Sequence, residues 1–111
     1  MDRLENYRNI IKRIIEEYAA FKPSYGEVEV ETIFDEARDH YEMMYAGWDL
    51  DERVHGSVIH VDIRDGKIWI QHDGIEDGIA PEMMKAGIPA EDIVLAFHHP
   101  DARKDTIFAA G

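Results

Sequence analysis

Apolar side chains in the first part of the chain recur every three or four residues, and charged side chains occupy the positions between them. This period is typical of an amphipathic helix with one face in a core. Asp2 is a suitable N-cap, and Pro23 stops the pattern, so we expect the helix to end near residues 20–22. The apolar stripe consists of Leu4, Tyr7, Ile10, Ile11, Ile14, Ile15, Tyr18 and Phe21.

The next two segments alternate with a period of two residues, which is typical of half-buried β-strands. In residues 27–34, one face of the predicted strand is mainly apolar, and the other is a row of glutamates that we expect to face solvent: Glu27, Glu29 and Glu31. Residues 40–48 predict a second strand, and Gly47 within it marks a bulge or a close backbone approach. One face of this second strand carries Met44, Ala46 and Trp48.

Residues 53–64 and 67–72 predict a β-hairpin, because both runs are rich in β-formers and Asp65-Gly66 between them favours a type I′ turn. Residues 79–86 predict a short helix, with Pro81 in its first turn and Gly87 after its end. The apolar run 93–97 predicts a last strand, and residues 98–105 are polar and interrupted by proline. We expect the tail, residues 106–111, to fray or to dock on a neighbouring chain.

These elements predict one α+β domain over residues 1–111. A long N-terminal helix packs on a mainly antiparallel sheet of four to five strands, and a short second helix precedes the last strand. Trp48 and Trp69 lie on or near the sheet face that the first helix leaves open, where aromatic residues are typical of an interface. The alternative is that they pack beneath the second helix.

The charge of the chain argues against direct DNA binding. The net charge is −12, and residues 27–52 contribute ten acidic side chains against Arg38 alone. A field of this sign repels phosphates, whereas Lys and Arg supply most of the affinity of DNA-binding proteins. The acidic excess either keeps the protein in solution or complements a basic protein partner.

Other classes of protein are excluded by composition. The chain has no cysteine, so thiolate metal sites, disulfides and cysteine nucleophiles are ruled out. No apolar run approaches the ~20 residues of a membrane span, and the charged N-terminus does not resemble a signal peptide. We therefore expect a cytoplasmic protein without membrane association.

Histidines and aspartates near strand ends suggest a possible metal site. His60 and Asp62 share one strand face, His72 ends the next strand, and His98 and His99 follow the last one. Neighbouring strands could bring several of these side chains together as ligands for zinc or iron. The spacing matches no motif of a metalloenzyme, and polar strand ends are common. We therefore predict no catalytic residue, metal or cofactor, and keep His72, His98 and His99 as the alternative metal ligands.

Several longer segments resemble one protein family, the XisI proteins or fdxN element excision controlling factors. The resemblance extends over essentially the whole chain, and the sequence departs from the family pattern at Ile75 and His99. The matching segments are residues 7–11, 23–30, 38–41, 47–48, 62–74 and 92–98.

The resemblance implies a cyanobacterial accessory protein in the programmed excision of a DNA element during heterocyst development. In that process a separate site-specific recombinase performs the strand chemistry, and the family acts beside a companion, XisH, that looks like an endonuclease fold. The family supplies no catalytic residue that could be carried over to this chain. We therefore expect a non-enzymatic regulator that contacts an XisH-like protein, with a recombinase complex as the second expected partner.

We place the partner interface at the acidic strand and the tryptophans, and we expect a homodimer because twofold pairs are common and an open sheet face needs cover. Two alternatives remain. One is an acidic inhibitor that mimics DNA toward a nuclease-like partner, and the other is a small metal-dependent enzyme that uses His72, His98 and His99. The predicted interface residues are Glu27, Glu29, Glu31, Trp48 and Trp69.

Overall fold

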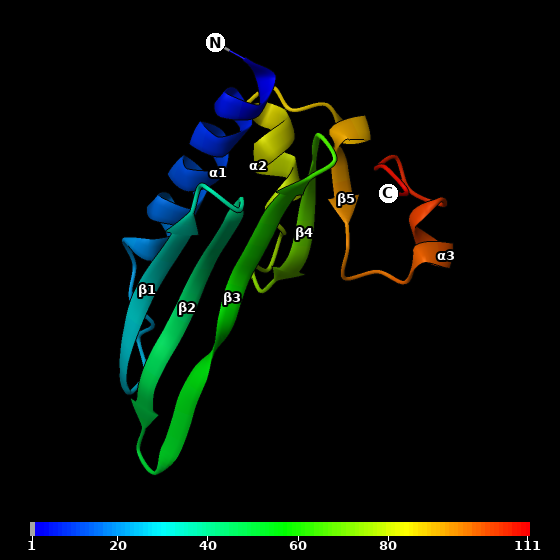
Figure 1. Ribbon diagram of the computed structural model, residues 1–111. Helices are drawn as coiled ribbons and strands as arrows, with labels where there is room; N and C mark the ends of the chain where they lie inside the picture. Colours follow the sequence, from blue (N-terminus) through cyan, green and yellow to red (C-terminus); the bar gives the residue numbers. More distant parts are fainter. Residues whose placement is uncertain (1) are drawn as a thin grey trace.

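A helix of 17 residues, α1 (Arg3–Ala19), opens the fold in the computed structural model, which describes residues 2–111 (Figure 1). Asp2 caps this helix, because its carboxylate accepts a hydrogen bond from the Glu5 amide at 3.0 Å. The helix ends within one residue of the predicted position. Its buried face consists of the predicted residues Tyr7, Ile10, Ile11, Ile14 and Ile15.

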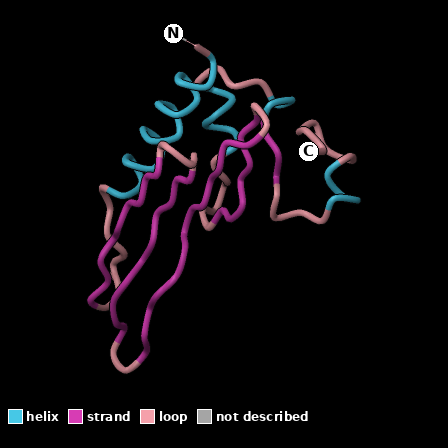
Figure 2. The backbone as a smooth tube through the Cα atoms, viewed as in Figure 1, coloured by secondary structure: helices cyan, strands magenta, loops and turns pink. Residues whose placement is uncertain are grey.

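Five strands form one sheet in the order β1-β2-β3-β4-β5 (Figure 2). Neighbouring strands are antiparallel except β4 and β5, which are parallel. The mainly antiparallel α+β fold is therefore confirmed. The strands are β1 (Glu27–Asp35), β2 (His40–Asp49), β3 (Glu52–Arg64), β4 (Lys67–Asp73) and β5 (Ile93–Leu95).

The turn between β3 and β4 has the predicted conformation. Asp65 and Gly66 adopt φ angles of 53° and 77°, and positive φ at both central residues defines a type I′ turn. A short helix, α2 (Ala80–Lys85), then connects β4 to β5. A connection through a helix lets the chain return in the same direction, which is why β5 is parallel to β4.

The C-terminal region differs from the prediction in three respects. β5 ends at Leu95 rather than at residue 97, because the chain turns there and the His98 amide donates to the Leu95 carbonyl oxygen at 3.1 Å. A short helix, α3 (Pro100–Arg103), forms in the polar, proline-interrupted segment 98–105, for which the sequence predicted no element. The tail docks on its own chain, since the Ala109 amide donates to the Ile93 carbonyl oxygen at 2.8 Å.

The core lies between one face of the sheet and the two helices α1 and α2. It is a single cluster of buried side chains from α1, α2 and four of the strands, with the residues before β5 closing one end. Most members are isoleucines, which suit strands and pack closely. The side chains with at most 1% exposure are Ile11, Ile15, Tyr41, Met43, Ile59, Val61, Ile68, Ile70, Ile79, Met83, Ile88, Ile93 and Val94.

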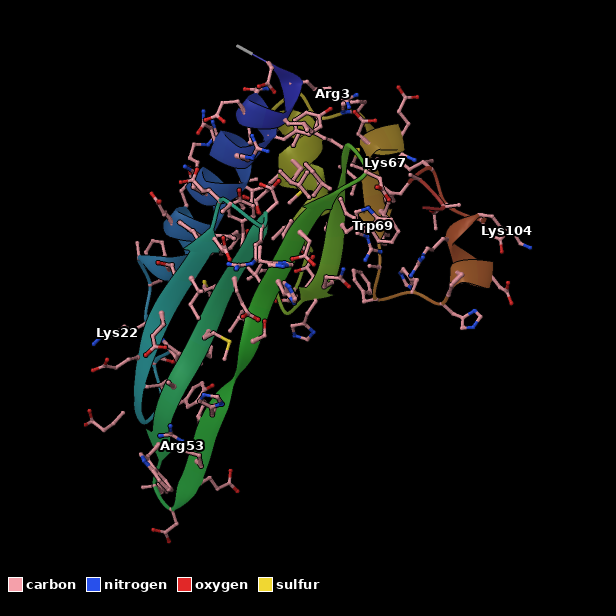
Figure 3. The ribbon with its side chains drawn as sticks, in the orientation of Figure 1. Arg3, Lys22, Arg53, Lys67, Trp69 and Lys104 are labelled. Atoms are coloured by element: carbon pink, nitrogen blue, oxygen red, sulfur yellow. The ribbon has the colours of Figure 1, made fainter. Side chains whose placement is uncertain are left out.

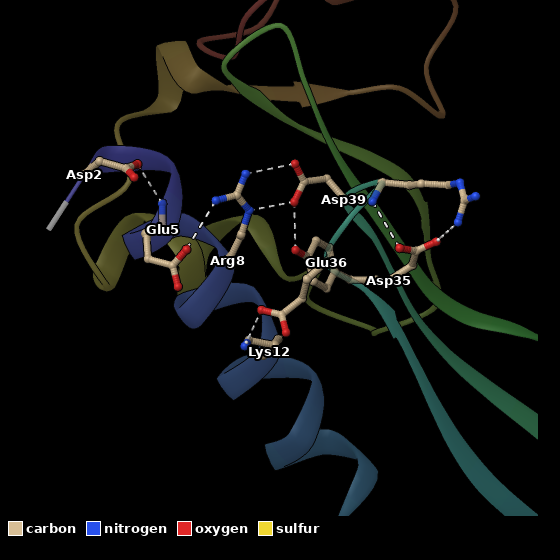
Figure 4. Close-up of polar contacts among 9 residues, drawn as sticks. Asp2, Glu5, Arg8, Lys12, Asp35, Glu36 and Asp39 are labelled. Carbon is tan, nitrogen blue, oxygen red and sulfur yellow. Dashed lines mark hydrogen bonds and ion pairs between the residues drawn. The ribbon is translucent and has the colours of Figure 1, made fainter.

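An ion pair ties α1 to the turn between β1 and β2 (Figure 4). Arg8 donates from Nε and Nη2 to the two carboxylate oxygens of Asp39, at 2.7 and 3.1 Å. Tyr41 donates its hydroxyl to the same carboxylate at 2.8 Å. The hydrogen bonds from Arg8 lower the pKa of Asp39 below its ordinary value; Tyr41 adds to this effect and burial opposes it.

The lowered pKa of Asp39 predicts an acid-sensitive contribution to stability. The contribution is complete above the ordinary Asp pKa of about 4 and is lost as the pH falls through the lowered pKa of the folded state. Asp39→Asn is a matched control, because Asn tolerates the left-handed backbone of residue 39, where φ is 57°. In urea unfolding, we expect the stability difference between the protein and this variant to be largest at neutral pH and to shrink in acid. A difference independent of pH contradicts the prediction.

Candidate functional site

Strands β1, β2 and β3 present one broad face away from the helices. Residues paired across antiparallel strands share a face, and Glu27 pairs with Trp48, which in turn pairs with Arg53. The buried residues of α1 and α2 pack against the opposite face. We call the first surface the outer sheet face; it comprises Glu27, Glu29, Glu31, Ile33, His40, Glu42, Met44, Ala46, Trp48, Arg53, His55, Ser57, His60 and Asp62.

The predicted glutamate row lies on this face. Glu27, Glu29 and Glu31 are all exposed on β1, one of the two edge strands of the sheet. Trp48 stands beside the row with 51% of its surface exposed. The guanidinium of Arg53 covers part of its ring at 5.4 Å from the centroid. The end of the sheet farthest from α2 is thus both acidic and aromatic.

Trp69, the other predicted interface tryptophan, lies in a different environment. It is 9% exposed, and the guanidinium of Arg64 stacks on its ring at 4.0 Å from the centroid. Its indole nitrogen donates to the Arg64 carbonyl oxygen at 3.0 Å, and Arg103 approaches the ring at 5.7 Å. Its strand neighbours Ile68 and Ile70 face the helices, so Trp69 faces away from α2.

The two tryptophans therefore lie on the same side of the sheet, since Trp69 pairs with Asp62, and neither packs beneath α2. They stand at opposite ends of that side and in different surroundings, one covered and one half-exposed. Figure 3 shows Trp69 beside the C-terminal region and Arg53, which covers Trp48, at the opposite end of the sheet. Two exposed apolar residues were not predicted from the sequence: Leu50, two residues after Trp48, is 92% exposed, and Ile33, which pairs with Glu42 farther along β1, is 50% exposed. A leucine within the acidic turn 49–52 was the available signal for the first of them.

A cluster of two histidines and one aspartate occupies the outer sheet face nearer to β4. His40 pairs with Asp62 across β2 and β3, and His60 lies two residues before Asp62 on the same side. One carboxylate oxygen of Asp62, Oδ1, lies 2.7 Å from His40 Nδ1 and 3.0 Å from His60 Nε2. The hydrogen bond and charge of Asp62 raise the pKa of His40.

The structure does not assemble the predicted set His72, His98 and His99. His72 is the second-last residue of β4 and pairs with His60 of β3. His98 and His99 lie in the turn after β5, where His99 caps α3 through its ring nitrogen. Within residues 2–111, the ligand atoms of three or more His, Asp or Glu side chains come within 4.8 Å of one another only at His40, His60 and Asp62. Sequence reasoning noted the last two but missed His40, which comes from a different strand.

Open grooves beside the C-terminal half of α1 carry a tyrosine that stays protonated. They are lined mainly by charged side chains, among them Glu17, Glu82 and Lys85. The Tyr18 hydroxyl donates to Glu82, and this bond together with burial raises the pKa of Tyr18 to about 12. A phenol with this pKa holds its proton at neutral pH and cannot act as a general base there. Its contact with Glu82 joins α1 to α2.

The fold and the exposed chemistry together define a class: a small α+β protein with helices on one face of a sheet and an acidic, partly apolar face on the other. Within residues 2–111, no helix is long and apolar enough to cross a membrane. The sequence profile of the family described as "XisI protein" matches residues 1–110, so the chain belongs to the XisI family. The resemblance seen in the sequence is confirmed.

Two solved structures from Anabaena variabilis are similar over almost the whole chain. The first, a XisI-like protein, is 38% identical in sequence to this chain and superposes with a TM-score of 0.92. The alignment covers 98% of this chain and 100% of that protein's chain. The second, described as fdxN element excision controlling factor XisI, is 40% identical, covers 99% of this chain and 100% of that chain, and has a TM-score of 0.87. Among curated proteins, no match is found.

Proposed function

We propose that this protein helps to control the excision of a DNA element, and that it does so by binding another protein rather than by catalysis. The process is supported by the relative described as fdxN element excision controlling factor XisI, which is 40% identical. The mode of action rests on one observation: the outer sheet face presents a glutamate row beside a half-exposed tryptophan. Aromatic anchors with a charged surround are typical of protein interfaces.

The charge of this face determines the kind of partner that we propose. Residues 27–52 carry a net charge of −9, which opposes the approach of DNA phosphates and steers a basic protein surface toward the face. An XisH-like protein is the proposed partner. We propose that the two proteins together act on a recombinase complex. Trp48, Ile33 and Leu50 supply apolar contacts around the glutamates.

A second candidate function is inhibition of a nuclease-like partner by mimicry of DNA charge. The observation that favours it is the spacing of Glu27, Glu29 and Glu31 on one exposed strand. Alternate residues of a strand lie about 7 Å apart, so the carboxylates form a regular negative row. Competition between a DNA duplex and this protein for the XisH-like partner distinguishes the two functions, because only the mimic would be displaced by DNA.

Charge reversal of the glutamate row is expected to weaken partner binding. The variant Glu27→Lys/Glu29→Lys/Glu31→Lys should raise the Kd for the XisH-like protein by roughly tenfold or more at low salt, and the difference should narrow as salt screens the charges. Isothermal titration calorimetry at several salt concentrations measures both effects. The matched control is the variant Glu16→Lys/Glu76→Lys/Glu91→Lys, which changes the net charge equally at exposed positions outside the outer sheet face.

Two outcomes contradict this assignment. If both triple variants bind equally well, the outer sheet face is not the contact surface. If the protein purified from a native lysate elutes alone as a dimer in size-exclusion chromatography with light scattering, the partner model loses its support. A homodimer that still binds the XisH-like protein is the state we propose, since a second copy can cover part of the open sheet.

A further inference from the structure

The cluster at His40, His60 and Asp62 has the composition of a metal site. Two imidazoles and a carboxylate form a donor set that suits Zn²⁺ and similar divalent transition ions, and cysteine is not required. All three residues lie on antiparallel strands held by the β2–β3 register. Their positions therefore depend on backbone pairing rather than on flexible loops, which favours a site of fixed geometry.

The three donor atoms lie within 4.8 Å of one another, and the two distances from Asp62 can be compared with those of a tetrahedral zinc site. With zinc–ligand distances of about 2.0–2.1 Å, tetrahedral ligand atoms lie about 3.3 Å apart. Asp62 Oδ1 lies 2.7 Å from His40 Nδ1 and 3.0 Å from His60 Nε2. Small side-chain rotations that move these atoms apart by roughly half an ångström would make room for an ion between them. The ion would replace the protons that join the two histidines to Asp62 by hydrogen bonds.

Neighbouring polar groups support the donors from behind. Glu42 Oε2 lies 3.9 Å from His60 Nδ1, an ion-pair distance longer than a hydrogen bond, so a carboxylate lies on the side of the ring nitrogen that would not bind the ion. Gln71 Nε2 donates to the second carboxylate oxygen of Asp62 at 3.3 Å, which leaves Oδ1 for the ion. Metal-bound histidines and carboxylates commonly have such partners, because they orient the ligand and select its tautomer.

Exposure of the cluster leaves room for water to complete the coordination. The side chain of Asp62 is 13% exposed, that of His60 35% and that of His40 55%. The carboxylate thus forms the floor of the site and the imidazoles its sides, with solvent above. We propose that His40, His60 and Asp62 bind one divalent transition metal ion, best matched by Zn²⁺, on the outer sheet face between β2 and β3.

Titration of the metal-free protein with Zn²⁺ tests the proposal, with isothermal titration calorimetry as the first readout and thermal unfolding as the second. We expect one ion per chain and a rise in Tm with Zn²⁺, because an ion that binds only the folded state stabilises it. His40→Ala and His60→Ala should each weaken binding by at least about tenfold and abolish the Tm rise. Mg²⁺, which prefers oxygen ligands, should produce neither effect.

His55→Ala is the matched control, because His55 is exposed on the same strand and face as His60 but lies outside the cluster. It should bind Zn²⁺ like the unmodified protein. The site is disproved if the protein binds no stoichiometric Zn²⁺, or if binding survives His60→Ala and is lost instead when His72, His98 or His99 is replaced. Circular dichroism of each metal-free variant verifies that loss of binding is not loss of the fold, and His40→Ala at an exposed side chain is the variant that preserves it best.

Discussion

Replacement of Gly47 by alanine should destabilise the protein by about 3 kcal/mol or more. A Cβ atom at this position would lie 2.0 Å from the Glu27 carbonyl oxygen and 2.7 Å from the Val28 Cα. Both are backbone atoms of β1, so no side-chain rotation relieves the overlap. The β1–β2 pairing has to open around Val28, which pairs with Gly47, and the buried side chain of Val28 then loses its packing.

Gly56 provides the matched control for this substitution. It lies in the neighbouring strand β3, and a Cβ atom added there meets nothing within 4 Å. Gly56→Ala should therefore change stability by less than about 1 kcal/mol, with a gain expected because alanine reduces the freedom of the unfolded chain. Urea unfolding of both variants measures the contrast. Equal stabilities for the two variants would show that β1 does not approach Gly47 as closely as in this structure.

Removal of the Trp69 side chain is the second substitution with a large expected effect. Trp69→Ala should cost about 3–5 kcal/mol, the range for large aromatic side chains in packed surroundings. The indole is 9% exposed, and Arg64, Arg103 and Gly111 lie against it. Its loss removes the surface on which the C-terminal segment rests, so residues 96–111 should become more susceptible to proteolysis.

Trp48→Ala is the natural comparison, because it removes the same side chain from an exposed position. We expect a change in unfolding free energy within about 0.5 kcal/mol, since surface substitutions rarely cost more. Denaturant unfolding and limited proteolysis of the two variants test the contrast. If Trp48→Ala is as destabilising as Trp69→Ala, Trp48 is not the exposed, weakly packed side chain that the structure shows.

The same pair of variants separates stability from the proposed binding function. Trp48→Ala leaves the fold intact and removes the largest apolar anchor of the outer sheet face, so it should weaken binding of the XisH-like protein. A reduction in binding by Trp69→Ala would instead follow from a loosened C-terminal region. Titrating the partner into both variants, after their stabilities are known, therefore assigns each tryptophan its role.

Local patterns in the sequence determined the elements that depend on near neighbours. The α1 stripe, the Asp2 cap and the Asp65-Gly66 turn follow from spacing and backbone preference within a few residues. The alternation around Glu29 also placed the glutamates on the outer face, because side chains of a strand alternate strictly. For Gly47, the sequence left a bulge and a close approach open, and the contact with Glu27 decides for the latter.

Only the tertiary structure decided which distant residues meet. His40 joins His60 and Asp62 because of the β2–β3 register, and Trp69 is covered because the tail returns to β5. Neither contact has a local signal: strand alternation assigns a residue to a face but not to a neighbour on another strand. The sequence alone thus established the α+β elements, the acidic face and the family resemblance. Chain-wide packing separated Trp48 from Trp69 and assembled the histidine cluster, because long-range contacts depend on how the whole core closes.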